Sequence, residues 1–264
     1  MLKYYSKLLL RFMIISWQRI RAFNFEFLMM FVQLIFNLSF ILIFWGALLR
    51  HIDAFGDWTF GQLALYSGIT FLGDSIGGVF FGFRDLPQKI VGGGLDKYMA
   101  RPINTLFSIL FEQVSIVYFL EQFIASLILI TIVITRYSLA VSPFNMILGF
   151  LVLFIGVIIY NMVYGAITFL AFWVGKLGVF RNIIFGLSQS KRYPLSIFPD
   201  GIRYLLTFFV PIAFISYYPT VIFLGKFKID LAFITQITLL LIGVSFIFSY
   251  VWNKGLKRYE ANGG

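Results

Sequence analysis

The sequence predicts an all-α integral membrane protein, with six transmembrane helices in a single domain over residues 1–264. The chain is 60% hydrophobic and only 12% charged, whereas soluble domains are roughly 25% charged. A hydrocarbon core about 30 Å thick needs roughly 20 apolar residues for each helical crossing. The sequence contains apolar runs for about six such crossings and little else, so we expect no separate soluble domain.

Composition also excludes several function classes. The net charge of +10 comes from Lys and Arg residues in the gaps between apolar runs, a pattern typical of positive-inside topology and not of a nucleic-acid-binding face. The chain has no cysteine and one histidine, His51, so we expect no Cys-ligated metal site and no zinc hydrolase. Gly175-Lys176 and Gly225-Lys226 lack the other residues of a phosphate-binding loop. We therefore expect a chain that is not an enzyme and that binds no metal or cofactor itself.

Residues 1–22 predict an amphipathic helix lying in the membrane interface. At about 100° per residue its polar side chains fall within a narrow arc, and the remaining surface is aliphatic and aromatic. Such a helix would bind anionic lipid headgroups. The alternative is a positive flank that only orients the first crossing, and both interpretations place the N-terminus in the cytoplasm. The residues of the arc are Lys3, Lys7, Arg11, Gln18 and Arg21.

Five of the six crossings follow directly from long apolar runs. Because the last of them ends in a basic tail and the N-terminus is inside, we expect both termini in the cytoplasm. The fourth run is long enough to tilt or to protrude. The five runs are Phe27–Leu49, Thr59–Phe83, a span within Leu106–Thr135, Phe144–Val174 and Leu231–Trp252.

The second crossing carries glycines and an acid. Gly73 with Gly77, and Gly78 with Gly82, are small residues four apart that allow helix backbones to approach closely in lipid. Asp74 costs roughly 3 kcal/mol at mid-membrane, which offsets about six apolar residues. It should face protein or water, either as a substrate or ion contact or as a hydrogen bond between helices. The surrounding Gly-Asp-Ser sequence resembles a serine nucleophile motif, but no base is near enough to activate a serine.

A charged loop, Arg84–Pro102, follows the second crossing and should lie in the cytoplasm. Asp85 and Pro87 favour the start of a short helix that runs to Val91. The glycines at 92–94 indicate a hinge, and Leu95–Arg101 can form a second turn that Pro102 stops. The loop is therefore either a compact cytoplasmic knob of two short helices or an ordinary charged connector.

The third crossing contains two acids, Glu112 and Glu121. Nine residues of one helix place them on opposite faces, so they do not form an obvious carboxylate pair. Glu112 can lie at the cytoplasmic interface, whereas Glu121 is deeper in the crossing.

The fifth crossing has two candidates. One is Leu177–Ser190, which leaves the proline-rich stretch Tyr193–Pro219 as a re-entrant hairpin on the outer side. The other is Tyr204–Leu224, which keeps Lys176–Arg203 in the cytoplasm. The distribution of Lys and Arg alone favours the second candidate, because the first leaves Lys191 and Arg192 outside.

The chain resembles the permease subunits of type-2 ABC exporters, in particular permeases of about 260 residues. Two groups of residues carry the resemblance, one after the second crossing and one before the last, and it covers essentially the whole chain in length, hydropathy and order of parts. The first group is Gly94, Leu95, Asp96, Arg101 and Pro102. The second is Tyr193-Pro194, Phe198-Pro199, Arg203, Leu206-Thr207-Phe208, Pro211, Tyr218-Pro219 and Leu224-Gly225.

The resemblance implies an N-terminal connector helix, a cytoplasmic coupling helix between helices 2 and 3, and a re-entrant hairpin over residues 193–225 before helix 6, which favours Leu177–Ser190 as the fifth crossing. It also implies two separately encoded ATPase subunits that bind ATP and Mg, and a second permease in a homodimer or heterodimer. The residues expected to contact the ATPase are Arg84, Asp85, Leu86, Pro87, Gln88, Lys89, Ile90, Val91, Leu95, Asp96, Lys97 and Arg101.

The leading hypothesis is therefore a multi-pass permease of the bacterial cytoplasmic membrane that exports an amphiphilic drug, lipid or peptide. The alternative is an ion-coupled carrier or channel that uses Asp74, Glu112 and Glu121 as a relay; such carriers often contain internal repeats, and none is evident in this sequence. The identity of the substrate and the choice between homodimer and heterodimer stay open.

Overall fold

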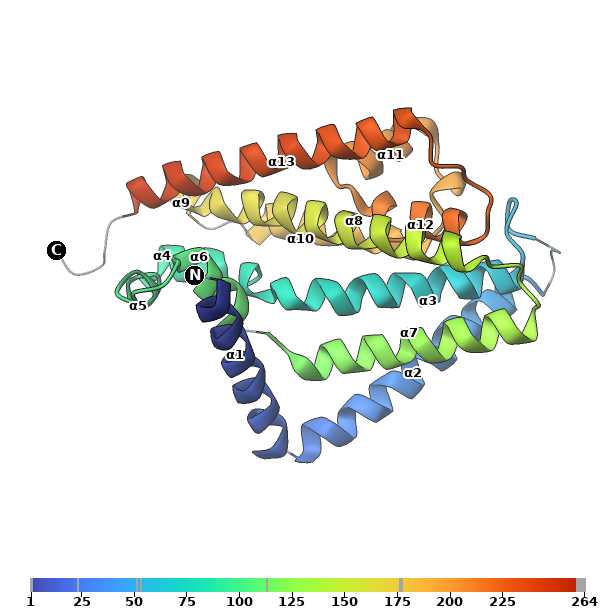
Figure 1. The fold of residues 1–264 in the computed structure, drawn as a ribbon, viewed down its shortest axis with the longest axis horizontal. Coiled ribbons are helices and arrows are strands. Elements are labelled where there is room, and N and C mark those ends of the chain that lie inside the picture. The colour runs from blue at the N-terminus through green and yellow to red at the C-terminus, as the bar shows by residue number, and fades with distance from the viewer. Residues whose placement is uncertain are drawn as a thin grey trace.

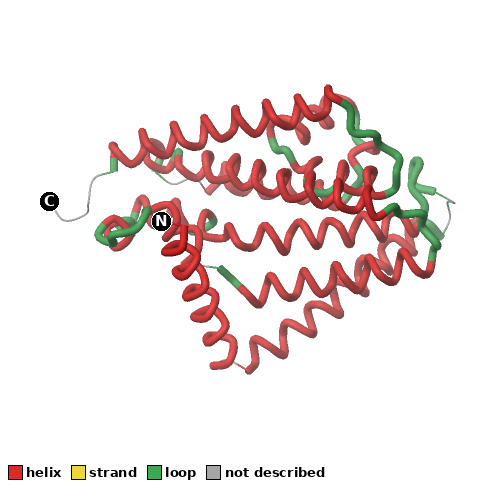
Figure 2. Tube along the Cα trace, in the orientation of Figure 1, coloured by secondary structure: helices red, strands yellow, loops and turns green. Residues whose placement is uncertain are grey.

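The computed structural model describes residues 2–22, 24–50, 52, 54–112, 114–175 and 178–259. These residues form helices, turns and loops without a strand (Figure 2). Long helices run side by side along the long axis of the molecule (Figure 1). They are α2 (Asn24–Leu48), α3 (Phe60–Gly77), α7 (Ile116–Arg136), α8 (Pro143–Phe169) and α13 (Leu231–Arg258).

Shorter helices and turns connect the long helices of this bundle. The short α-helices are α4 (Leu86–Val91), α5 (Asp96–Met99), α6 (Thr105–Glu112), α9 (Ala171–Val174), α10 (Gly178–Gln189), α11 (Asp200–Tyr204) and α12 (Tyr217–Phe223). The 3-10 turns are η1 (Gly78–Phe83), η2 (Ser190–Arg192), η3 (Leu195–Ile197) and η5 (Ile212–Phe214), and a π-helical turn forms η4 (Leu205–Phe209).

Four helices of the described chain are long and apolar enough to cross a membrane. A fifth candidate is the pair Asp200–Phe209 and Ile212–Phe223, which is bent by 79° and is either a broken span or a re-entrant loop. The all-helical membrane fold is thus confirmed, whereas the number six stays a prediction. The four helices are Leu28–Leu48, Ile116–Arg136, Pro143–Val174 and Leu231–Arg258.

The two ends of the bundle carry different elements. At one end lie α4, α5, α6, α9 and the end of α13 (left in Figure 1). At the other end lie the connection between α2 and α3, the connection between α7 and α8, and α12 (right in Figure 1). The loop after the second predicted crossing and the last residues of α13 are therefore on one side, as expected if both face the same compartment.

The N-terminal helix α1 (Leu2–Ala22) leaves the bundle at a steep angle to its long axis (Figure 1). It contacts α6 through Tyr5, whose ring lies 4.8 Å from that of Phe107. Ser16 Oγ donates to the carbonyl of Val114 at 2.8 Å and accepts from the amide of Ile116 at 3.2 Å. These bonds satisfy backbone groups that are left unpaired where the chain is not helical.

The third predicted crossing is not one helix, which corrects the expected placement of its two acids. Glu112 ends α6, and α7 begins at Ile116 after Ser115, whose hydroxyl accepts from the amide of Tyr118 as a helix N-cap. The apolar run hid this break because hydropathy does not report capping, and a serine caps a helix by side-chain chemistry alone. Glu112 and Glu121 therefore belong to two different helices.

The fifth crossing stays open between its two candidates. The residues of the first form α10, which at about 1.5 Å per residue is too short to span the bilayer alone. The residues of the second overlap most of the bent pair of segments, which begins at Asp200. Both stretches are helical, so helix content does not separate the two interpretations.

The glycines of α3 and η1 differ in how closely their neighbours approach. A Cβ atom added to Gly73 would lie 2.4 Å from Ile215 Cγ2, and one added to Gly82 would lie 2.0 Å from the carbonyl oxygen of Ile109. At Gly77 the nearest atom would be 3.9 Å away. Gly82 is the most constrained of these three, because its neighbour is backbone that cannot rotate aside.

We expect Gly82→Ala to lower the stability of the protein by about 1–3 kcal/mol, because the added methyl group overpacks a backbone contact. Thermal unfolding in detergent, followed by size-exclusion chromatography, measures this change. Gly77→Ala is the matched control and should unfold within error of wild type. Equal melting temperatures for the two variants would contradict the close approach at Gly82.

Candidate functional site

Residues 84–102, which we call the knob, form a two-sided surface at one end of the bundle. Leu86, Pro87 and Ile90 of α4 are buried. Gln88 and Val91 are exposed, and their spacing of three residues places them on one face of α4. Arg84, in the turn before α4, is also exposed. The knob therefore has one face packed on the bundle and one face open to a partner.

The glycines of the knob fix the end of α4. The amide of Gly94 donates to the carbonyl of Lys89 at 2.8 Å, and Gly93 has φ +71°. This is the Schellman arrangement, in which the left-handed residue after a helix is usually glycine. The expected hinge is thus a helix cap in this structure. Asp85 precedes α4 but makes no side-chain cap bond; its carboxylate instead accepts from Arg84 Nε at 3.3 Å.

The second turn of the knob is organised around the buried Tyr98. Three cations surround its ring, at 4.6 Å for Lys97, 5.0 Å for Lys89 and 5.5 Å for Arg101. Cations at such distances are attracted by the negative face of an aromatic ring. The knob thus holds its positive charge close to one buried aromatic side chain.

Two carboxylates connect the knob to neighbouring helices. Glu112, at the end of α6, lies 3.5 Å from Lys97 Nζ and 3.2 Å from Arg101 Nη1. Asp96 accepts a hydrogen bond of 2.9 Å from the hydroxyl of Tyr259, which follows α13. Burial, together with this bond to Asp96, raises the pKa of Tyr259, so its hydroxyl remains a donor at neutral pH.

An aromatic cluster lies under the buried face of the knob. Phe83, Phe169 and Phe248 form a triangle with ring centroids 5.0–5.8 Å apart, and Trp252 lies 4.9 Å from Phe169. Leu86 and Ile90 pack into the same cluster. The knob is therefore joined through tightly packed side chains to the ends of α8 and α13.

The basic face expected on the N-terminal helix is exposed on the surface of the molecule. Lys3, Lys7 and Arg11 are all exposed, and their spacing of four places them in one row along α1. The side chain of Arg21 lies outside the described part of the chain.

A second charged region lies inside the bundle around Asp74. Lys191, in η2, forms an ion pair with the Asp74 carboxylate. The two side chains are only 13% and 19% exposed. Asp74 is therefore paired with a cation between helices, and Lys191 lies beside α3, away from the loops at the ends of the bundle.

Two cavities meet at this ion pair, and Asp74 and Arg192 line both of them. The cavity between α3, α8 and α10 has a volume of about 280 Å³ and polar walls that include Tyr118 and Asn161. The cavity between α2 and α3 has a volume of about 220 Å³. Asp74 and Arg192 therefore lie between two neighbouring cavities and line both of them.

The other intramembrane acid, Glu121, is buried and hydrogen-bonded. Its Oε1 accepts from Asn37 Nδ2 at 2.9 Å and from Gln122 Nε2 at 3.2 Å. Glu121 connects α7 to α2, whereas Glu112, at the end of α6, is paired with Lys97 and Arg101 of the knob. The three acids considered for a relay are therefore not together: the structure separates Glu112 from Asp74 and Glu121.

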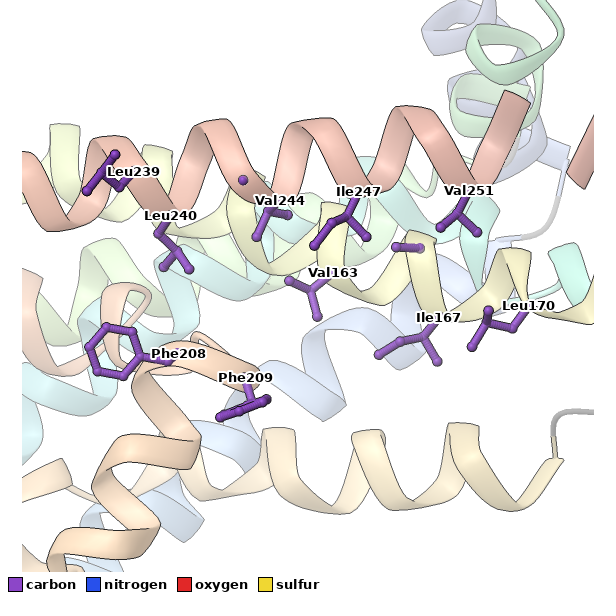
Figure 3. A pocket seen from close by; sticks show the side chains of 12 residues that line it. Val163, Ile167, Leu170, Phe208, Phe209, Leu239, Leu240, Val244, Ile247 and Val251 are labelled. Atoms are coloured by element: carbon purple, nitrogen blue, oxygen red, sulfur yellow. The ribbon is translucent and has the colours of Figure 1, made fainter. Parts of the chain in front are cut away.

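A third, apolar cavity of about 470 Å³ lies between α8, α13 and η4. Figure 3 shows Phe208 and Phe209 facing Val163 and Ile167 of α8 and Val244 and Ile247 of α13. Its lining is almost entirely aliphatic and aromatic, so it offers no specific chemistry of its own.

Sequence reasoning missed Lys191, Arg192 and Asn161 as parts of a site. The signal was present for the two cations, because the Leu177–Ser190 placement of the fifth crossing leaves a pair of basic residues outside, against the positive-inside rule. A basic residue that breaks this rule is a candidate partner for an intramembrane acid. Asn161 gave no such signal, since one asparagine in an apolar run does not indicate a cavity.

We expect Asp74→Asn to destabilise the protein by on the order of 3 kcal/mol, because it leaves Lys191 buried without a counter-charge. The double variant Asp74→Asn with Lys191→Met should recover much of this loss, since it removes both charges. Thermal unfolding in detergent measures both. Asp200→Asn is the control, because the Asp200–Arg203 ion pair is exposed and should contribute little. A double variant that is less stable than Asp74→Asn would contradict the pairing.

Comparison with known proteins supports the membrane-transporter interpretation. A family model described as ABC-2 family transporter protein matches residues 35–263. No curated protein and no solved structure matches the chain. Because the family match runs from within α2 past the end of α13, the chain belongs to the ABC-2 transporter family and is a permease of an ABC transporter, a membrane component that associates with ABC ATPase subunits.

Proposed function

We propose that this permease is an exporter subunit and that the knob is the coupling element that receives force from a separately encoded ATPase. The observation that carries the proposal is the two-sided knob. Its outer face presents Val91 and Met99, each 46% exposed, beside exposed polar side chains. Its inner face is packed on aromatic side chains of α8 and α13. A push on the outer face is therefore passed to two long helices.

The chemistry of the outer face suits a protein partner. Exposed apolar side chains rimmed by charged residues are a common feature of protein–protein contact sites. ATP and Mg²⁺ would be bound by the partner, and this chain would contribute only the docking surface. The knob end of the bundle is then cytoplasmic, which places both ends of the chain in the cytoplasm of a bacterial cell.

The assembly we propose contains two permeases and two ATPases. The second permease is either a copy of this chain or a similar subunit. The exposed row of Lys3, Lys7 and Arg11 lies on anionic lipid headgroups, where each basic residue contributes about 1 kcal/mol. In this arrangement α10 forms the main part of the fifth crossing, and residues 193–225 form a re-entrant hairpin before α13, which the 79° bend supports.

The ion-coupled carrier is the weaker candidate because Glu112 is paired with cations of the knob and lies apart from the intramembrane acids. Asp74→Asn in proteoliposomes under a proton gradient separates the two functions. If the permease is an ATP-driven exporter, neither wild type nor variant shows flux driven by the gradient, and transport depends on ATP. If the acids form a relay, wild type shows gradient-driven flux and the variant loses it.

We expect a stable ATPase subunit to co-purify with the permease. Its rate of ATP hydrolysis should rise when the transported substrate is present. Lys89→Glu and Asp96→Lys should each reduce transport about tenfold or more while the permease remains folded, because reversed charge disturbs the knob at the interface. Val91→Glu tests the exposed face without altering a contact inside the knob. Transport and ATP hydrolysis in proteoliposomes are measured together.

Lys228→Glu is the matched control for charge reversal. Lys228 is exposed and follows α12 at the opposite end of the bundle. It should leave the coupling of hydrolysis to transport unchanged. Full transport by the permease without any ATPase would rule out the proposal.

A further inference from the structure

We propose that the charged cavities beside α3 bind the anionic headgroup of an amphiphile and that Arg192 is the residue that binds it. This inference rests on the proposed export function, because it names the chemical class of the exported substrate. It concerns the walls of the two cavities around Asp74, and it does not involve the knob.

Arg192 lacks an anionic partner among the described residues. Asp74 is paired with Lys191, and Arg84 lies beside Asp85. Arg192 lines both cavities, yet its guanidinium makes no hydrogen bond and no ion pair with any residue that the structure describes. Arg192 is exposed, so its guanidinium is accessible to a ligand. At membrane depth, an ionisable side chain without a counter-charge favours an anionic ligand or an ion pathway.

The charge of the cavity favours an anion. Its charged lining consists of one acid, Asp74, and three basic residues, Arg84, Lys191 and Arg192. After Asp74 is paired with Lys191, the excess charge is positive. The planar guanidinium of an arginine matches the geometry of a phosphate or carboxylate group, which it binds through two parallel hydrogen bonds.

Neutral hydrogen-bonding groups complete the polar wall. Asn161, Gln189 and Ser188 line the same cavity as Arg192. Small-molecule sites typically combine a few such polar groups with apolar walls. At about 280 Å³ and 220 Å³ the cavities suit a headgroup and not a complete lipid.

The tail of the ligand has an aromatic path on α2. The cavity between α2 and α3 is lined by Phe40 and Phe44 opposite Asp74 and Arg192. Phe36, Phe40 and Phe44 are stacked along α2, with ring centroids 6.1 Å and 6.3 Å apart. Phe36 and Phe40 are 66% and 55% exposed, so this row connects the cavity to the lipid-facing surface. An apolar tail on this row and an anionic head at Arg192 describe one amphiphile.

Dodecyl phosphate is the probe that tests this site. We expect radiolabelled dodecyl phosphate to bind the full-length permease saturably in dodecyl maltoside, where a neutral amphiphile with the same chain is in excess. Micelles without protein give the background. Arg192→Gln should weaken binding by about tenfold or more, because a charge-assisted bidentate contact is lost. Arg192→Lys should retain part of the affinity.

Matched variants separate the site from general effects. Arg136→Gln removes an exposed arginine at the end of α7 and should bind like wild type. Phe40→Ala should also weaken binding; because Phe40 is 55% exposed, this variant does not depend on repacking the core. Each variant must elute from size-exclusion chromatography as wild type does.

Three results would overturn the proposal. The first is equal affinity of wild type and Arg192→Gln for dodecyl phosphate. The second is displacement of the probe by inorganic phosphate as effectively as by unlabelled dodecyl phosphate, which would indicate a free-anion site. The third is that Arg192→Gln separates a permease dimer into monomers while its affinity for dodecyl phosphate stays unchanged. That result would assign Arg192 to the contact between the two permeases. Because the assay contains no ATPase, these results do not depend on the test of the coupling knob.

Discussion

The burial of α3 is the constraint on which the rest of the structure depends. This helix carries Asp74, whose carboxylate would have no partner in lipid, whereas the hydroxyls of Ser67 and Thr70 donate to carbonyl oxygens of the helix itself. It is therefore enclosed by α2, α7 and α8, and its own groups bind the segments around it. The hydroxyl of Tyr66 lies 2.7 Å from Ser216 Oγ and 2.9 Å and 2.8 Å from the carbonyl oxygens of Lys191 and Tyr193. One polar helix thereby fixes the position of the irregular segment before α13.

This arrangement gives residue 191 a role that the positive-inside rule does not consider. The rule describes cations that lie in water on one side of the membrane. Lys191 is instead held inside the bundle by a carboxylate 117 residues earlier in the chain. A local pattern contains no information about a partner at that distance, so the sequence indicated an inconsistency and the structure supplied its physical reason.

Features with a local cause were predictable from the sequence, and features that depend on distant contacts were not. The bounds of the N-terminal helix and of both turns of the knob follow from periodicity, proline and glycine. The break before Ile116 was missed because its cause includes Ser16, on a helix a hundred residues away. The ion pair of Asp74, and the lack of an anionic partner for Arg192 among the described residues, likewise could not be predicted. The expectation that Asp74 faces protein needed only the cost of an acid in lipid.

The charged cavity and the knob are parts of one continuous path. α3 carries Asp74 and continues through η1 into α4, so the wall of the cavity and the knob are consecutive in the chain. Arg84, at the start of the knob, also lines the cavity that contains Asp74 and Arg192. Between them, Gly82 packs against the carbonyl of Ile109, and a 3-10 turn replaces the α-helix. Such turns hold their shape less firmly than α-helices and often mark hinges. A displacement of the knob would therefore move Arg84, a cationic side chain of the cavity, directly. In the proposed mechanism, this would give ATP-driven motion a short route to the proposed anionic headgroup.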